Sequence, residues 1–223
     1  IIRPQPLTDG ITTVGNLLPD EEVDLSFETS GKIVAINFQE GAAVRKGELL
    51  AKVNDKPLLA QLSRYEAQLK LAEDRVYRQS APLEQDAVSQ EAFEQARTEL
   101  AILNADIDIV KSNIALTELR APFDGIIGLR NVSEGAYASP SVVGAKLTKI
   151  SPLTIDFFVP ERYASQIRPG TRLSFTIEGR QERFEAEVYA TETQVDVTTR
   201  TLAVRARYPN ARGRLMPGRF ATV

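Results

Sequence analysis

The sequence has 223 residues, and its 30 acidic and 27 basic side chains give a formal net charge of −3 at pH 7. It contains no long run of Lys and Arg of the kind that nucleic acid requires, so we expect no nucleic-acid partner. Because Cys and His are both absent, disulfides, imidazole catalysis and the commonest metal ligands are excluded.

The chain opens on Ile1, and no stretch approaches the roughly 20 apolar residues that span a bilayer. We interpret it as a processed or trimmed piece of a longer protein. Any signal or membrane anchor would then lie outside these residues.

Two segments of the chain follow one pattern, SGKIVAINFQEGAAV at 30–44 and DGIIGLRNVSEGAYA at 124–138. Each has a second glycine, Gly41 or Gly135, ten positions after the first, and that glycine follows a glutamate. Such a glycine fits a turn that requires positive φ. The pattern predicts a repeat offset by 94 residues; the alternative is two unrelated hairpins that share a common turn.

Each half of the repeat is predicted to contain a short strand, a Glu-Gly turn and a second strand. By their apolar alternation, we equate strand Leu49–Val53 with Lys146–Ile150. Neither half has enough strands to bury a core alone, so we expect the two to pack face to face with approximate twofold symmetry.

The residues that carry this pattern resemble the two halves of a biotinyl/lipoyl carrier domain: Gly31, Glu40, Gly41, Val44, Gly47, Leu49, Gly125, Glu134 and Gly135. In such a carrier, Lys56 of the stretch GELLAKVNDKP would be the candidate for cofactor attachment. Pro57 instead favours the first turn of a helix, so Lys56 is predicted to begin a helix. We interpret it as a solvated charge at a strand–helix junction.

Two heptad patterns lie between the halves of the repeat. Apolar residues recur at 58, 62, 65, 69, 72 and 76, and again at 93, 96, 100, 103, 107, 110 and 114. Matching seams predict an antiparallel coiled-coil hairpin. Pro82 disfavours further helix and Ser89 is a good N-cap, so the turn is predicted within about 81–88.

After Ile150 the pattern becomes β-rich, with strands expected at 153–159, 172–177, 183–190 and 201–208 and one or two helical turns in PERYASQI. Several short strands at regular spacing suggest a small barrel. The predicted fold is therefore mixed but mainly β. A split lipoyl-like sandwich (22–56 and 120–150) holds a helical hairpin (57–119), and residues 1–21 and 151–223 form a β-barrel domain.

With this order of modules and the segments FFVPE, VDVTTRTLAVRA and LMPGRFATV, the chain resembles periplasmic adaptors, or membrane fusion proteins, of resistance-nodulation-division (RND) tripartite efflux pumps. The resemblance implies a non-enzymatic connector without a cofactor. Its partners would be an inner-membrane transporter and an outer-membrane channel, and it would self-associate as a trimer or hexamer in the periplasm. The anchor to the inner membrane would lie outside this chain.

The resemblance also implies a membrane-proximal domain, to which only residues 1–16 could contribute here. The alternatives are an adaptor of a type I secretion exporter, which usually has a longer hairpin, and a lipoyl or biotinyl carrier subunit. A carrier would show added mass on its lysine.

The family's hairpin tip carries an arginine, a leucine four residues later and a serine seven after that, which matches Arg78 and Ser89 here. Phe93 matches the apolar position that follows, whereas Pro82 takes the place of the leucine and Leu83 comes next. The resemblance implies that Arg78, Leu83, Ser89 and Phe93 bind the channel. The alternative is that Ser89 only caps its own helix while Arg78 pairs with Asp74.

Overall fold

The computed structural model describes residues 11–83, 90–179 and 182–223. The chain divides into two units, which are described separately. The sandwich unit comprises Asp24–Phe123 and Ile127–Lys146, and the barrel unit comprises Ile1–Val23, Asp124–Ile126 and Leu147–Val223. None of the helices in the described part of the chain combines the length and apolar character that crossing a bilayer needs.

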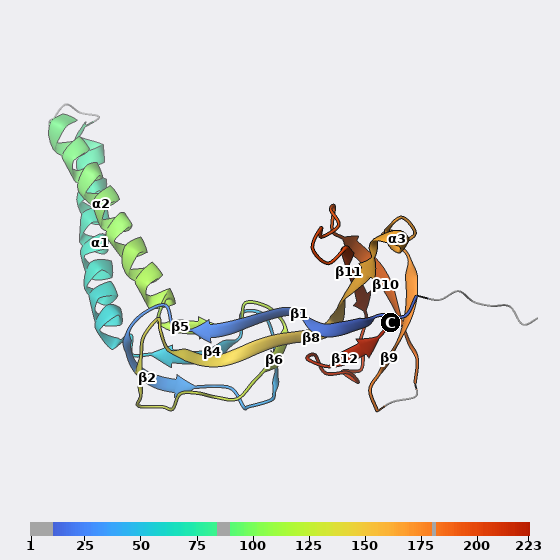
Figure 1. The fold of residues 1–223 in the computed structure, drawn as a ribbon. Coiled ribbons are helices and arrows are strands. Elements are labelled where there is room, and N and C mark those ends of the chain that lie inside the picture. The colour runs from blue at the N-terminus through green and yellow to red at the C-terminus, as the bar shows by residue number, and fades with distance from the viewer. Residues whose placement is uncertain (1–10, 84–89, 180–181) are drawn as a thin grey trace, which may run out of the picture. The chain divides into compact units, whose positions relative to one another are not determined.

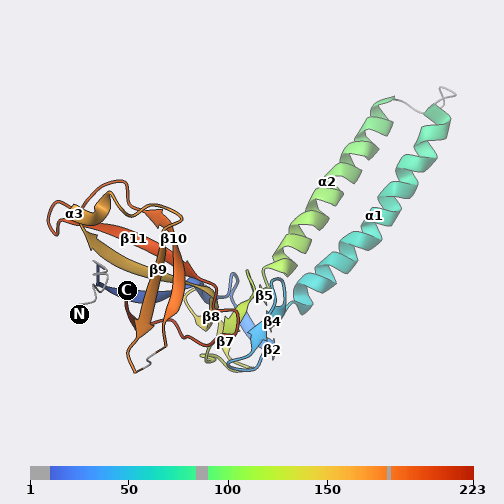
Figure 2. The ribbon, with the colours of Figure 1, turned by 90° about the vertical axis from the view of Figure 1, so that its right-hand side faces the viewer.

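The barrel unit is built from strands that close on themselves (Figures 1 and 2). Strands β1, β12, β9, β10, β11 and β8 pair in that order, and β1 also pairs with β8, which completes the ring. The bounds are β1 Val14–Ser26, β8 Val143–Pro160, α3 Glu161–Ala164, β9 Arg172–Ile177, β10 Phe184–Thr191, β11 Thr201–Tyr208 and β12 Phe220–Thr222.

The interior of the barrel is filled by alternate residues of these strands. Along β10 the pattern of burial alternates strictly from Phe184 to Val188, as expected for a strand with one face on a core. The rings of Phe175 and Phe184 lie 5.4 Å apart, and Tyr208 packs edge-on against both. These contacts make the barrel a closed module with its own core.

Two expectations for this unit need correction. Strand β8 runs without a break from Val143 to Pro160, so the predicted strands 146–150 and 153–159 are one. Residues 13–16, which could have belonged to a membrane-proximal domain, pair instead with β12 and Val223 in the barrel. Residues 1–10 lie outside the described residues. The helix α3 is one turn, within the predicted range.

The sandwich unit contains the helical hairpin and short strands. Strands β5, β4, β2 and β7 form one sheet in that order, and β6 pairs with β3 in the other. The bounds are β2 Gly31–Ile36, β3 Ala43–Val44, β4 Leu49–Val53, α1 Lys56–Leu83, α2 Gln90–Ala115, β5 Glu118–Arg120 and β7 Tyr137–Ala138. Strand β6, Gly125–Ile127, includes residues of both units. A small core around Phe27, Ile33 and Val53 holds the unit together.

Reciprocal hydrogen bonds show the twofold symmetry of the repeat. The Gly41 N–H donates to the Ile127 carbonyl and the Gly135 N–H donates to the Ile33 carbonyl, each at 2.9 Å. Gly41 and Gly135 have φ values of 77° and 87°. Since each half supplies the same donor and acceptor to the other, the predicted repeat and its positive-φ turns are confirmed.

The glutamates before these glycines are reciprocal as well. The Glu134 carboxylate accepts a hydrogen bond from the Ile36 N–H at 3.1 Å, and the Glu40 carboxylate accepts one from the Arg130 N–H at 2.8 Å. Each glutamate therefore satisfies a backbone donor at the equivalent position of the opposite half, at the end of β2 or three residues after β6, which gives a physical reason for the shared Glu-Gly pair.

The predicted equivalence of Leu49–Val53 with 146–150 is wrong by three residues. In the first half the Asn37 N–H donates a hydrogen bond to the Leu50 carbonyl at 2.8 Å. In the second half the equivalent Asn131 N–H donates to the Gly144 carbonyl at 2.9 Å. The equivalent segment is thus 143–147, at the same offset as the glycines. Apolar alternation continues through β8, so alternation alone could not fix the register.

Candidate partner-binding site on the helical hairpin

The hairpin is an antiparallel coiled coil in which both predicted seams are confirmed. Every predicted seam residue of α1 and α2 is half-buried or buried, whereas most of the others are exposed. Ala96, Ile107 and Val110 of α2 are fully buried. The seam therefore supplies the contact that keeps two long helices together, because isolated helices in water are only marginally stable.

The helix α1 continues to Leu83, into the range of about 81–88 within which the turn was predicted, and α2 begins at Gln90. Pro82 lies one residue before the end of the helix. A proline there removes only one hydrogen bond from the last turn, which makes it less disruptive than in a helix interior. Residues 84–89 lie outside the described residues.

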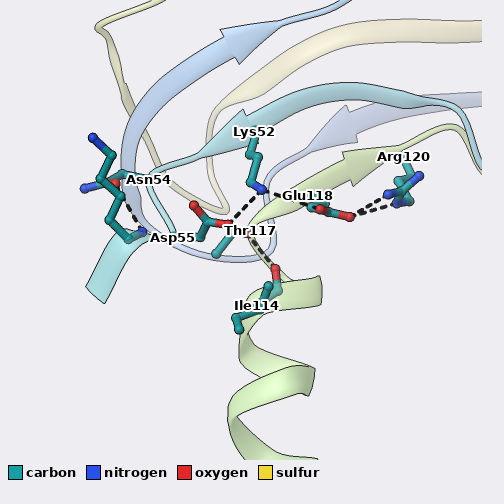
Figure 3. Close-up of polar contacts among 8 residues, drawn as sticks. Lys52, Asn54, Asp55, Ile114, Thr117, Glu118 and Arg120 are labelled. Carbon is teal, nitrogen blue, oxygen red and sulfur yellow. Dashed lines mark hydrogen bonds and ion pairs between the residues drawn. The ribbon is translucent and has the colours of Figure 1, made fainter. Parts of the chain in front are cut away.

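The base of the hairpin is joined to the sandwich by a polar cluster (Figure 3). The Lys52 ammonium lies 2.7 Å from the Asp55 carboxylate and 3.7 Å from that of Glu118. The hydrogen bond that the Lys52 ammonium donates to the Asp55 carboxylate raises the pKa of Lys52, with Glu118 adding to the shift. Arg120 bonds to Glu118 and to the carbonyl of Gly47. These contacts link the strand that enters the hairpin to the strand that leaves it.

Lys56 is the first residue of α1, as predicted. Its backbone N–H donates to the Asn54 side chain at 3.3 Å, and the Asp55 carbonyl accepts the N–H of Leu59. The Asn54 side chain thus satisfies a backbone donor that a helix start leaves without an intrahelical partner, and the Asp55 carbonyl accepts the first hydrogen bond of the helix. A carrier lysine needs an exposed β-turn, whereas here the chain passes from strand to helix with two residues between them.

The structure describes only part of the predicted tip. Arg78 is exposed, and Phe93 is half-buried with the Arg97 guanidinium 5.9 Å from its ring centre. Ser89 and the side chain of Leu83 lie outside the described residues. Within the described part of the chain no hydrogen bond or cation–π contact joins Arg78 to Phe93, so their joint role stays a prediction.

The ion pair proposed in the alternative interpretation does not form. Among the described residues, neither Asp74 with Arg78 nor Glu66 with Lys70 makes an ion pair. The pair between the helices joins Arg75 to Glu99 at 2.8 Å instead. The Arg78 guanidinium is thus not held by the neighbour that sequence spacing suggested.

Two features of the hairpin were missed in the sequence. Tyr77 is 79% exposed beside Arg78, and an aromatic residue outside the seam could have indicated it. A groove of about 330 Å³ lies between the helices, with Leu71 and Ile102 among its lining residues. Both of these side chains are more than half exposed.

The segment with Thr199, Arg200 and Thr201 lies in the barrel unit, at the loop between β10 and β11. The Asp196 carboxylate accepts hydrogen bonds from the N–H groups of Thr198 and Thr199, and these bonds lower the pKa of Asp196. Arg200 has a φ of 53°. The motif that sharpened the family resemblance is therefore a compact turn, whose role visible in the structure is to shape this loop.

Family comparison matches both units. Residues 21–149 match the RND MFP barrel-sandwich hybrid domain, and residues 154–223 match the CusB-like beta-barrel domain. Among curated relatives, the chain is 25% identical to Multidrug resistance protein MdtA of Proteus mirabilis, with 96% of this chain and 57% of the relative covered. It is 26% identical to the solvent efflux pump periplasmic linker SrpA of Pseudomonas putida, with 98% and 62% covered.

The fold is also that of known structures. A MacA-MexA chimeric protein with the Pseudomonas aeruginosa MexA alpha-hairpin domain superposes with a TM-score of 0.83 at 20% identity, covering 95% of this chain and 78% of that one. A putative efflux transporter from Bacteroides eggerthii gives 0.78 at 23% identity, with 95% and 67% covered. The chain spans 57–62% of the two curated relatives named above. Since the barrel-sandwich match alone covers more than half of its residues, the chain belongs to the membrane fusion protein family of RND pumps.

Proposed function

We propose that this chain is the central part of a periplasmic adaptor, which links an inner-membrane RND transporter to an outer-membrane channel without catalysing a reaction. The observation that carries this proposal is the order of modules: a split sandwich, interrupted by a long helical hairpin and followed by a barrel. The anchor to the inner membrane would lie outside these residues. We further propose that the adaptor acts as an oligomeric ring of three or six copies.

The shape of the hairpin supports a connecting role. Helices of 28 and 26 residues would reach about 40 Å from the sandwich at 1.5 Å per residue. The two-residue junctions and the Lys52 cluster hold the base of the hairpin to its sheet. A projection that is long and fixed at one end suits contact with a partner at its far end.

We propose that the tip, with Arg78, Leu83, Ser89 and Phe93, is the part that contacts the channel. An exposed guanidinium can bond to carbonyl or carboxylate groups at the ends of partner helices, and an aromatic side chain can enter a groove between them. The absence of an ion pair between Asp74 and Arg78 among the described residues leaves that guanidinium available for a partner.

The variant Arg78→Asp tests this proposal. We expect it to abolish efflux-dependent drug resistance and crosslinking of the tip to the channel. Its melting temperature should stay within a few degrees, because an exposed ion pair contributes at most about 1 kcal/mol to folding. The control is Arg45→Asp, at an exposed arginine of the sandwich. Normal efflux by Arg78→Asp, or a loss that is explained by unfolding, would exclude the tip as the docking site.

The type I secretion alternative has less support, because both family matches carry RND descriptions. The carrier alternative would require a modified Lys56 at the start of a helix. The mass of the intact protein purified from cells separates the carrier alternative from the adaptor.

A further inference from the structure

The barrel unit carries a groove of about 380 Å³, lined by residues of β8, of β11 and of the loop that joins β10 to β11. All of its lining residues belong to this one unit. The side chain of Phe158 forms part of the lining and is 51% exposed, whereas its neighbours Phe157 and Val159 are buried in the barrel. The groove therefore lies on the outer wall of the barrel, and an aromatic ring is open to it.

Strand pairing fixes the order of the side chains across this groove. Phe158 of β8 pairs with Ala203 of β11, and on the other side of Ala203 the Glu192 N–H donates to the Ala203 carbonyl at 2.9 Å. Residues that lie opposite each other in antiparallel strands point to the same face of the sheet. The small side chain of Ala203 therefore forms a floor between the ring of Phe158 and the carboxylate of Glu192.

The side of the groove that faces Phe158 carries a second carboxylate. Asp196 forms an antiparallel bridge with Thr201, which lies two residues before Ala203 on β11 and so on the same face of the sheet. The side chains of both Glu192 and Asp196 line the groove. Two carboxylates therefore lie across the floor from the aromatic ring.

The remaining lining of the groove is apolar or uncharged, and in the described part of the chain it includes no basic residue. The two arginines nearest to the groove along β11, Arg200 and Arg205, are not among the lining residues, and Arg205 is held by Asp156 at 3.2 Å. Val195 packs against the barrel core, and Val197 is 82% exposed. The groove thus combines apolar walls with two negative charges.

We propose that this groove binds a small organic cation with an apolar or aromatic body. The cation lies over Ala203, between the ring of Phe158 and the carboxylates of Glu192 and Asp196. The face of an aromatic ring attracts a cation, most strongly where the site is partly removed from water. The carboxylates add charge complementarity, and Val197 covers part of the apolar body. An anion of the same shape keeps only the apolar contacts and is repelled by the two carboxylates.

Two probes of equal shape and opposite charge test this proposal. Tetraphenylphosphonium is an apolar cation, and tetraphenylborate is its anionic counterpart. In isothermal titration calorimetry with the purified chain, we expect tetraphenylphosphonium to bind and tetraphenylborate to bind about tenfold more weakly or not at all. Added salt should weaken the binding of the cation, because charges near the surface are screened. Equal binding of the two probes, or no binding of the cation, would overturn the proposal.

Conservative variants place the bound cation in the groove. Glu192→Gln keeps the size of the side chain and removes its charge, and Phe158→Leu keeps an apolar side chain and removes the ring. We expect each to weaken tetraphenylphosphonium binding by about fivefold. The melting temperature should change little, because both side chains are exposed. The matched control is Glu187→Gln, at an exposed carboxylate of β10 outside the groove, which should bind the cation like the parent chain.

Unchanged binding in both groove variants, or an equal loss in the Glu187→Gln control, would show that the cation binds elsewhere, and the proposal would fail. If the parent chain binds no cation and the groove variants instead lose crosslinking to another protein in cells, the groove is a protein contact and the proposal fails as well. Cation binding is measured on the chain alone and does not rest on the adaptor function, which Arg78→Asp tests separately.

Discussion

The two halves of the repeat make equivalent hydrogen bonds to each other, but the chain continues differently after the last strand of each half. After Val53 the first half uses Asn54 and Asp55 to start α1, whereas after Leu147 the second half continues in β8. At the position equivalent to Asp55, Lys149 bonds to Asp20 at 2.8 Å and Glu21 at 3.1 Å on β1.

The difference shows that one set of residues closes the sandwich and another sets the path of the chain beyond it. The Glu-Gly turns are reciprocal and fix the symmetric pairing. The residues after the last strand of each half determine which element follows. In the first half, Asn-Asp-Lys-Pro supplies capping groups and a proline suited to a first helical turn. Thr-Lys-Ile-Ser, at the equivalent place, keeps the alternation of a strand.

The largest effect should come from a substitution in the helical hairpin, which follows the first half of the repeat only. Leu103→Asp places a charge in the hairpin seam, so we expect the hairpin to unfold and most of the helical circular dichroism to disappear. The paired strands of both halves should keep their protection from hydrogen exchange, because their hydrogen bonds do not involve the seam. Ile102→Asp, one residue away and exposed, is the control and should keep its helices. A similar loss of helix in both variants would contradict the seam assignment.

A smaller effect should be equal in the two halves. Ile33 and Ile127 are equivalent and almost fully buried. We expect Ile33→Ala and Ile127→Ala each to lower the free energy of unfolding by about 2–5 kcal/mol, since each deletes buried methyl groups and leaves a cavity. Urea denaturation measures both, with the exposed Val34→Ala as a control near zero. A large cost in one half and none in the other would show that the symmetry does not extend to the packing.

The smallest effect should be a pH-dependent change in melting temperature at Lys149, which follows the last strand of the second half. The hydrogen bonds that Lys149 donates to Asp20, which has the larger effect, and to Glu21 raise the pKa of Lys149. A raised folded-state pKa adds stability that is complete below the unfolded pKa of about 10.4 and is lost as pH rises through the folded value. Lys149→Ala should therefore melt slightly below the parent protein at neutral pH, and the difference should vanish in strong alkali. Lys56→Ala, at the start of α1 after the first half of the repeat, should show no such difference. A Lys149→Ala difference that persists unchanged in alkali would show that the ion pair is not its source.

The sequence predicted local features better than register. The seams could be predicted because a heptad pattern depends only on residues close together in one helix. The glycine turns could be predicted because a positive φ restricts the residue type. The equivalence of the final strands failed because 143–150 alternates acceptably in two registers, and hydrogen bonds between distant residues decide between them.

The candidate site was only partly predictable for a similar reason. Arg78 and Phe93 were found by resemblance, and their contact with a channel stays a prediction. Tyr77 and the groove lined by Leu71 and Ile102 were not predicted, because these residues lie outside the two apolar seams that define the hairpin in the sequence. Their exposure follows from the packing of the two helices and not from the sequence pattern alone.

The pairing of β4 with β5 has a consequence for how this architecture can vary. The chain enters and leaves the hairpin through adjacent antiparallel strands, with Lys52 opposite Glu118. An insertion at such a junction has its two ends side by side whatever its length. Whole heptads could be gained or lost together in both helices, each adding or removing about 10 Å of reach, while the seam keeps its phase. The sandwich would serve as an unchanged base for projections that span gaps of different width.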